Sequence, residues 1–329
     1  MTRIKKNRLA LVIIVIIITG IVLGYLAVDN TENGVNPINP GEKIGVIVSI
    51  APEVEFVKAV GGDKVDVTLM VPSTADVHTY EPLPSQLSKV SSAQMYVMIG
   101  SQLEFENNYM DKLRSSNPNM LVVNSSEGIE LIPSSEGNET EESHEDETEE
   151  SHEDETAETH EDETEDHHEH GIMDAHVWTS PRNAKIMVNN IYEGLVEVDP
   201  ENKEYYQKNR DEYLAKLDEL DRNTTELLEN KTKPILIYHP AFAYYAKDYN
   251  LTMTGVMIND EEPSPQRIAM MVDIAQENNI TVVYVEPQYD PKFMQTIASQ
   301  IGAEVLFVND LDENYLENMK NVGIAFSKS

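Results

Sequence analysis

The chain has 329 residues, a length that fits two domains of ordinary size. It carries 59 acidic against 24 basic residues and a formal net charge of -35, which makes nucleic acid an unsuitable partner. Cysteine is absent, which excludes disulfides, thiolate metal sites, a cysteine nucleophile and the lipid-bearing cysteine of a bacterial lipoprotein.

A hydrophobic segment near the N-terminus indicates the compartment. Residues 9–28 form an uncharged run of 20 residues, and about 20 are needed to cross the hydrocarbon core of a bilayer. The basic residues that precede it are expected to stay in the cytoplasm: Arg3, Lys5, Lys6 and Arg8. The run is longer than a signal-peptide core and lacks a clear cleavage site, so residues 1–28 are predicted to be an uncleaved membrane anchor. Whether anchored or cleaved and secreted, the rest of the chain is expected at the outer face of the membrane.

Two similar bodies follow a tether. Residues 29–42 are rich in Asn, Gly and Pro and have no hydrophobic period, which is typical of a linker. After them, short β-branched runs alternate with amphipathic segments of helical spacing. The expected strands lie at 44–50, 65–71, 94–100 and 120–123, and then at 234–239, 251–257, 281–286 and 304–308. This alternation predicts an α/β fold with two βα lobes of parallel sheet, residues 43–180 and residues 233–329.

The segment between the lobes has a different character. Residues 181–232 contain no strand candidate and show helical spacing with a break at Pro200, so we expect a long helical connector. Parallel sheets with right-handed crossovers bind ligands at the carboxyl ends of their strands. The cleft between the two lobes is therefore the expected binding site.

An acidic, histidine-rich segment interrupts the first lobe. Residues 135–170 contain 19 acidic residues and no basic one, and residues 142–165 are three near-copies of an octapeptide. Without aromatic or branched aliphatic side chains, this segment is expected to be a disordered loop. Six of the nine histidines lie in it: His144, His152, His160, His167, His168 and His170. Imidazole binds zinc, copper and nickel, so we interpret these residues as auxiliary metal contacts; a solvated acidic linker with incidental histidines is the alternative.

The three remaining histidines have distinctive surroundings. Any one of His78, His176 and His239 alone would be expected to be a hydrogen-bonded structural histidine. However, each follows a predicted strand or lies at a turn, in the contexts HTYEPLPSQ, DAHVWTSP and HPAFAYYA respectively. These contexts resemble the metal-binding family of solute-binding proteins that feed ABC importers for zinc and manganese. The resemblance extends from residue 44 to the C-terminus, and VEPQYDPK from Val285 and the charged insertion are also similar to the family.

The resemblance implies two βα lobes joined by a rigid backbone helix, with one metal ion held between them by His78, His176 and His239. Family members commonly add a carboxylate just before the final helix, where this chain has Asn309 followed by Asp310. A carboxylate would offset the charge of a buried dication held by neutral imidazoles. Asp310 is therefore the first candidate for a fourth ligand. The alternatives are Glu286, Asn309 and a water molecule.

Zinc is the expected ligand of this site. A manganese-type site of the family would have an acidic residue in place of His239, and oxygen-rich ligation suits that harder ion. The chain contains no Walker motif, so the resemblance implies a receptor that delivers Zn²⁺ to an ABC permease powered by a cytoplasmic ATPase. We expect a monomer without enzymatic activity.

Three alternatives stay open. The first is a receptor of the same family for Mn²⁺ or another divalent metal. The second is a membrane-anchored zinc hydrolase, because three histidines and a water molecule also form a catalytic zinc site. No HExxH pairing is present, although Glu286 could act as its general base. The third, an adhesin or a loop-only metal buffer, would not need the three histidines outside the loop.

Overall fold

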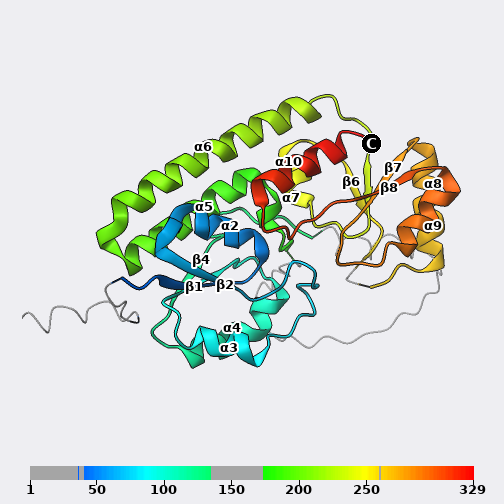
Figure 1. Cartoon of the computed structure of the whole chain (residues 1–329). Helices are drawn as coiled ribbons and strands as arrows, with labels where there is room; N and C mark the ends of the chain where they lie inside the picture. Colours follow the sequence, from blue (N-terminus) through cyan, green and yellow to red (C-terminus); the bar gives the residue numbers. More distant parts are fainter. Residues whose placement is uncertain (1–35, 37–40, 135–172, 259–260) are drawn as a thin grey trace, which may run out of the picture.

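Two α/β lobes lie side by side in the computed structural model, which describes residues 36, 41–134, 173–258 and 261–329 (Figure 1). Each lobe is built on a four-stranded parallel sheet. The N-terminal sheet has the order β2-β1-β3-β4, from β1 (Ile44–Val48), β2 (Val65–Leu69), β3 (Met95–Met98) and β4 (Leu121–Asn124). The C-terminal sheet repeats it as β6-β5-β7-β8, from β5 (Ile235–Ile237), β6 (Met253–Gly255), β7 (Val282–Val285) and β8 (Glu304–Phe307).

Helices connect the parallel strands, as crossovers require. The N-terminal lobe has α2 (Ala51–Gly61), α3 (Pro84–Val90) and α4 (Glu104–Ser116). The C-terminal lobe has α7 (Ala243–Asp248), α8 (Pro265–Glu277), α9 (Lys292–Ile301) and α10 (Tyr315–Phe326). Local sequence explains several ends: the Ser264 side chain accepts from the Arg267 N–H to cap α8, and α9 stops at Gly302, whose φ of 72° is left-handed.

The connector consists of two helices, α5 (Pro181–Val198) and α6 (Lys203–Leu228), separated by the short 3-10 turn Pro200–Asn202. The Ser180 hydroxyl caps α5 by accepting two backbone N–H groups, and a proline occupies the first turn, where its missing N–H is not needed. Helix α6 buries one stripe of side chains and contacts both α2 of the first lobe and α10 of the second. Figure 1 shows it running along both lobes.

Among the described residues, one of two hydrophobic clusters extends across both lobes. It includes Val48 and Val97 of the first sheet together with Tyr245, Tyr315 and Phe326 of the second lobe, all less than 2% exposed. A second cluster fills the other face of the C-terminal sheet. Burial of apolar surface contributes about 25 cal/mol per Å², so this shared core stabilises the orientation of the lobes relative to each other.

The predicted α/β class, with two lobes of parallel sheet and a long connecting helix, is confirmed. The predicted anchor at residues 1–28 and the predicted loop at residues 135–170 lie outside the described residues. Among the residues that are described, no helix combines the length and the apolar character that a membrane span requires.

Candidate metal site

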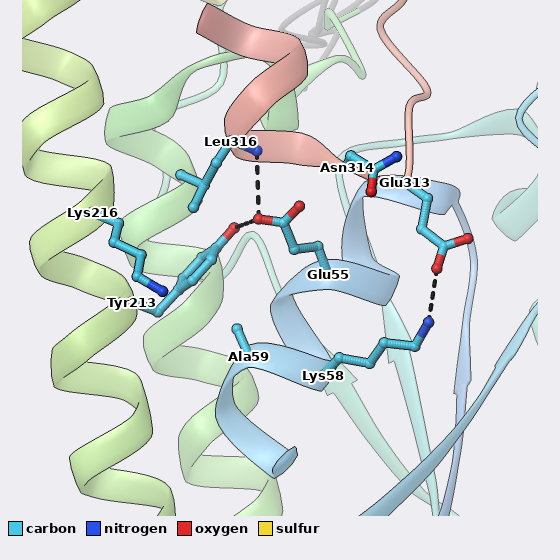
Figure 2. Close-up of a pocket in the computed structure, with 8 residues that line it drawn as sticks. All are labelled: Glu55, Lys58, Ala59, Tyr213, Lys216, Glu313, Asn314 and Leu316. Carbon is cyan, nitrogen blue, oxygen red and sulfur yellow. Dashed lines mark hydrogen bonds and ion pairs between the residues drawn. The ribbon is translucent and has the colours of Figure 1, made fainter. Parts of the chain in front are cut away.

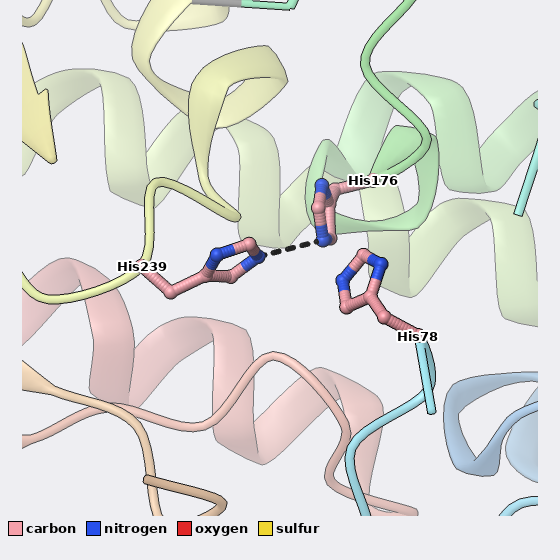
Figure 3. A group of neighbouring side chains, drawn as sticks. All are labelled: His78, His176 and His239. Atoms are coloured by element: carbon pink, nitrogen blue, oxygen red, sulfur yellow. Dashed lines mark hydrogen bonds between the residues drawn. The ribbon is translucent and has the colours of Figure 1, made fainter. Parts of the chain in front are cut away.

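Three histidines from separate loops converge between the lobes (Figure 3). His78 lies between β2 and α3, His176 lies just before α5, and His239 follows β5. One ring nitrogen of each lies within 4.8 Å of the others, and the Nε2 atoms of His176 and His239 are 3.1 Å apart. His176 is 7% and His239 is 4% exposed, so the convergence is almost sealed from solvent.

Carboxylates orient two of the three rings. Asp174 Oδ1 lies 3.0 Å from Nδ1 of His176, and Glu104 Oε2 lies 2.7 Å from Nδ1 of His78. A carboxylate accepts hydrogen bonds, so Nδ1 carries the proton of each neutral ring and Nε2 keeps its lone pair. The two rings are therefore held in the tautomer that a metal ion requires.

The rings differ in their affinity for protons. Burial by itself lowers the pKa of His176, but the charge and hydrogen bond of Asp174 outweigh it and the pKa is raised. The pKa of His239 is well below its ordinary value, because it is buried and faces His176 and His78. His239 is consequently neutral at physiological pH, whereas His176 holds a proton more readily.

The space between the histidines is very small. The cavity has a volume of about 10 Å³, enough for one ion or water molecule. Its lining residues are Asp76, Val77, His78, His176, His239, Gln288, Tyr289, Asp310 and Leu311. Asp310 is 6% exposed, and burial raises the pKa of its carboxyl group although the nearby His176 and His78 lower it. It lies outside the group of atoms within 4.8 Å of one another, and its Oδ1 accepts a 3.4 Å hydrogen bond from Gln288.

The other candidate ligands have different surroundings. Glu286 is fully buried and its Oε2 accepts from the backbone N–H of His239 at 3.3 Å; burial and the charge of Asp310 raise its pKa well above the ordinary value. Asn309 Oδ1 accepts from the N–H of Leu311 at 2.9 Å. Neither Glu286 nor Asn309 lines the histidine cavity. The candidate loop ligands lie outside the described residues: His144, His152, His160, His167, His168 and His170.

The two chain ends that flank the histidine-rich segment meet near the site. Pro133 and Met173 form an antiparallel bridge, and the Asp174 N–H donates to the Ile132 carbonyl at 2.9 Å. The Tyr244 hydroxyl of α7 donates to the Asp174 carbonyl at 2.8 Å. The base of the segment is thus joined to the residue that orients His176.

Three residues around the site were not among those predicted from the sequence: Asp174, Glu104 and Gln288. Asp174 stands two positions before His176 in the DAHVW context, which was a usable signal. Glu104 is 26 positions from His78, and Gln288 contacts Asp310 from the loop after β7. No local spacing connects Glu104 or Gln288 with the histidines, because only the packing of strands and loops brings them together.

Two parallel-sheet lobes joined by a long helix, with histidines of both lobes around a cavity for one ion, define a metal-binding solute-binding protein. The chain belongs to the family described as zinc-uptake complex component A, periplasmic, whose model matches residues 46–328.

Relatives of known name agree with this assignment. The chain is 35% identical over 289 residues to the high-affinity zinc uptake system protein ZnuA of Bacillus subtilis, covering 87% of this chain and 84% of that protein. It is 28% identical over 294 residues to the manganese ABC transporter substrate-binding lipoprotein PsaA of Streptococcus anginosus, covering 86% of this chain and 85% of that protein. A crystal structure of ZnuA superposes with a TM-score of 0.74 at 31% identity, covering 88% of this chain and 99% of that one. The family resemblance is therefore confirmed.

Proposed function

We propose that this protein is an extracytoplasmic receptor that binds Zn²⁺ through His78, His176 and His239 and delivers it to an ABC permease with a cytoplasmic ATPase. The separation of 3.1 Å between the Nε2 atoms of His176 and His239 carries the proposal. Zinc–nitrogen bonds of 2.0–2.1 Å in a tetrahedron place two ligand nitrogens about 3.3 Å apart. An ion between these rings needs only small side-chain shifts.

Asp310 is proposed as the fourth ligand. Three neutral imidazoles leave both charges of Zn²⁺ uncompensated, and a buried dication without a counter-charge is strongly unfavourable. Asp310 is the carboxylate of the second lobe that lines the cavity. With it, the site takes two ligands from each lobe, so any relative movement of the lobes or opening of a loop would break the set and release the ion.

The ligand chemistry favours zinc over manganese. Imidazole nitrogen suits zinc, whereas manganese prefers sites richer in carboxylate and carbonyl oxygen. The family includes both zinc and manganese proteins, so membership alone does not identify the metal. The ligand residues of this chain have to identify it. In this chain His239 supplies a nitrogen where a manganese-type site would supply an acidic oxygen.

The hydrolase alternative has little support. Substrate pockets usually measure about 300–1,000 Å³. The cavity at the histidines measures about 10 Å³, and Glu286, the suggested base, does not line it. The site is suited to holding an ion rather than a substrate with a reacting bond, and we propose that the protein has no catalytic activity.

We further propose that the protein is a monomer, held at the outer face of the membrane by residues 1–28. The histidine-rich segment would collect zinc beside the cleft, because its flanking residues Pro133 and Met173 pair close to Asp174. Each weak contact in the segment would raise the local zinc concentration and leave tight binding to the cleft.

The test is a calorimetric zinc titration of residues 43–329 at neutral pH, with excess Mn²⁺ as competitor. We expect one tight site that survives deletion of residues 135–170 and is lost in His78→Ala, whereas the matched control His152→Ala, which removes a loop histidine, keeps it. Loss of tight binding on deletion of the segment, or ready displacement of zinc by manganese, would overturn the ligand assignment or the metal.

A further inference from the structure

The segment that carries Asp310 comes from the second lobe but is fastened to the first. Residues 309–316, here called the Asp310 segment, connect β8 to the start of α10. Asp310, Leu311 and Tyr315 are 6%, 3% and 1% exposed. Buried polar backbone must find partners, and two backbone groups of this segment, the Asp310 carbonyl and the Leu316 N–H, find theirs across the lobe boundary.

The inner attachment is through Trp178. Its indole Nε1 donates to the carbonyl oxygen of Asp310 at 2.9 Å, and the Tyr315 hydroxyl donates to the Trp178 carbonyl at 2.9 Å. The Trp178 ring also lies 5.2 Å from the ring of His176. Trp178 is part of the metal site itself, because it contacts a proposed ligand of each lobe, His176 and Asp310.

The outer attachment is through Glu55 on α2 (Figure 2). Its Oε1 accepts from the backbone N–H of Leu316 at 3.4 Å and from the Tyr213 hydroxyl of α6 at 2.6 Å. The N-cap residue of α10, Asn314, makes no side-chain capping bond. Glu55 therefore supplies a negative acceptor to the first turn of α10 from the opposite lobe, where it favours the helix dipole.

A second ion pair lies beside this contact. Lys58 Nζ is 2.7 Å from Glu313 Oε1, with side chains 56% and 50% exposed. Exposed pairs of this kind contribute between nothing and about 1 kcal/mol, because water screens the charges and side-chain entropy opposes them. Both contacts border one cavity of about 430 Å³ between α2, α6 and α10, but only Glu55 binds the helix backbone.

We propose that Glu55 is a positioning residue for the bound metal: by holding the start of α10 on α2, it keeps the Asp310 segment docked and the Asp310 carboxylate at the cleft. The inference rests on the proposed function, with Asp310 as a zinc ligand. Glu55 touches none of the ligands, so it acts on the lifetime of the bound ion through the segment between them.

The experiment measures zinc dissociation from the purified full-length chain into excess chelator. We expect Glu55→Ala to release zinc about 2- to 30-fold faster than the wild type, the range of couplings carried by residues away from a ligand. Glu55→Gln, which keeps an acceptor oxygen for Leu316, should restore much of the wild-type rate and also covers the case in which Glu55→Ala does not fold. The visible spectrum of the Co²⁺ form of Glu55→Ala should shift toward that of Asp310→Asn.

Two matched controls separate positioning from general stability. Tyr213→Phe removes the other hydrogen bond of Glu55 and leaves Leu316 bonded, and Lys58→Met removes the adjacent ion pair. Both should release zinc at close to the wild-type rate, and each more slowly than Glu55→Ala. In an Asp310→Asn background, Glu55→Ala should add no further acceleration.

Four outcomes would overturn the inference: an unchanged rate in Glu55→Ala, no rescue by Glu55→Gln, additive effects in the double variant, or rates in all variants that simply follow their melting temperatures. Failure of the proposed function gives a different result, since the wild type would then lack a tight zinc site that depends on His78.

Discussion

Replacing Asp174 by Asn should separate the charge behind His176 from the geometry of its ring. Asp174 Oδ1 accepts from the backbone N–H of His176 at 2.8 Å and lies 3.0 Å from Nδ1 of the ring. An asparagine can keep its side-chain oxygen in the same place, so the ring should retain its orientation and tautomer. The variant loses the negative charge that stabilises a cation bound at Nε2.

Partners behind a metal ligand are typically worth 10–100-fold in metal affinity, which corresponds to about 1.4–2.7 kcal/mol. Asp174 is 6% exposed, so solvent and salt screen its charge poorly. We therefore expect Asp174→Asn to lose zinc affinity within this range. The assay is a competition titration against a chromophoric zinc chelator at pH 8. Asp174→Ala, which also removes the acceptor, should weaken binding further than Asp174→Asn.

The loss should become smaller in acid. Asp174 raises the pKa of His176, so in the wild type a proton competes with zinc at that ring as the pH falls toward and below the raised pKa. Without the carboxylate the ring binds the proton less tightly, and zinc displaces it more easily. The affinity ratio of wild type to Asp174→Asn should therefore be largest at pH 8 and smaller at pH 5.5.

The chain offers a matched control at the other D-x-H pair. Asp76 Oδ1 accepts from the backbone N–H of His78 at 2.9 Å, whereas the ring of His78 is held by Glu104. Asp76→Asn should thus weaken zinc less than Asp174→Asn does. An equal or larger loss for Asp76→Asn, or an Asp174→Asn ratio independent of pH, would refute the reasoning.

Three further predictions concern the fourth ligand and the core. Asp310→Asn should weaken zinc binding by about 100-fold or more, because a charge near a dication is worth several kcal/mol even at an effective dielectric of about 20. Asn309→Ala should change zinc binding little. A zinc titration that gives the reverse order would identify Asn309 as the ligand. Burial and the charge of a neighbouring carboxylate raise the pKa of Glu53 well above its ordinary value. The folded protein therefore binds this proton more tightly than the unfolded chain does, and the stability that the proton contributes is present below the unfolded-state pKa and is lost as pH rises through the folded-state pKa. Glu53→Gln should therefore gain stability relative to the wild type between pH 5 and pH 8, by at most about 1.4 kcal/mol per pH unit in urea unfolding of the metal-free protein, and a constant difference would contradict the pKa shift. Gly194→Ala should lower the free energy of unfolding by about 1 kcal/mol, since an added Cβ would lie 2.4 Å from Val123 Cγ2 and overpacking outweighs the gain in helix propensity; equal or higher stability would show that the sheet yields.

Local patterns in the sequence were sufficient for the architecture. Each β-branched run, such as residues 44–50 or 281–286, became a strand, because a short run of this kind suits a sheet covered on both faces by helices. Pro200 marked the break between α5 and α6, because proline suits a helix start and disrupts a helix interior. The resemblance around His78, His176 and His239 identified the family.

The side-chain contacts around the site are what local sequence patterns did not predict. The chain by itself determined the two lobes, the helix between them and the three histidines to examine, since these depend on periodicity, helix signals and short motifs. Tertiary structure alone decided that Glu104 orients His78 and that Glu55 anchors α10 across the lobes. Hydrogen bonds between distant segments depend on how sheets and loops pack, and neither the residue types nor their spacing along the chain encodes that packing in a form that can be read locally.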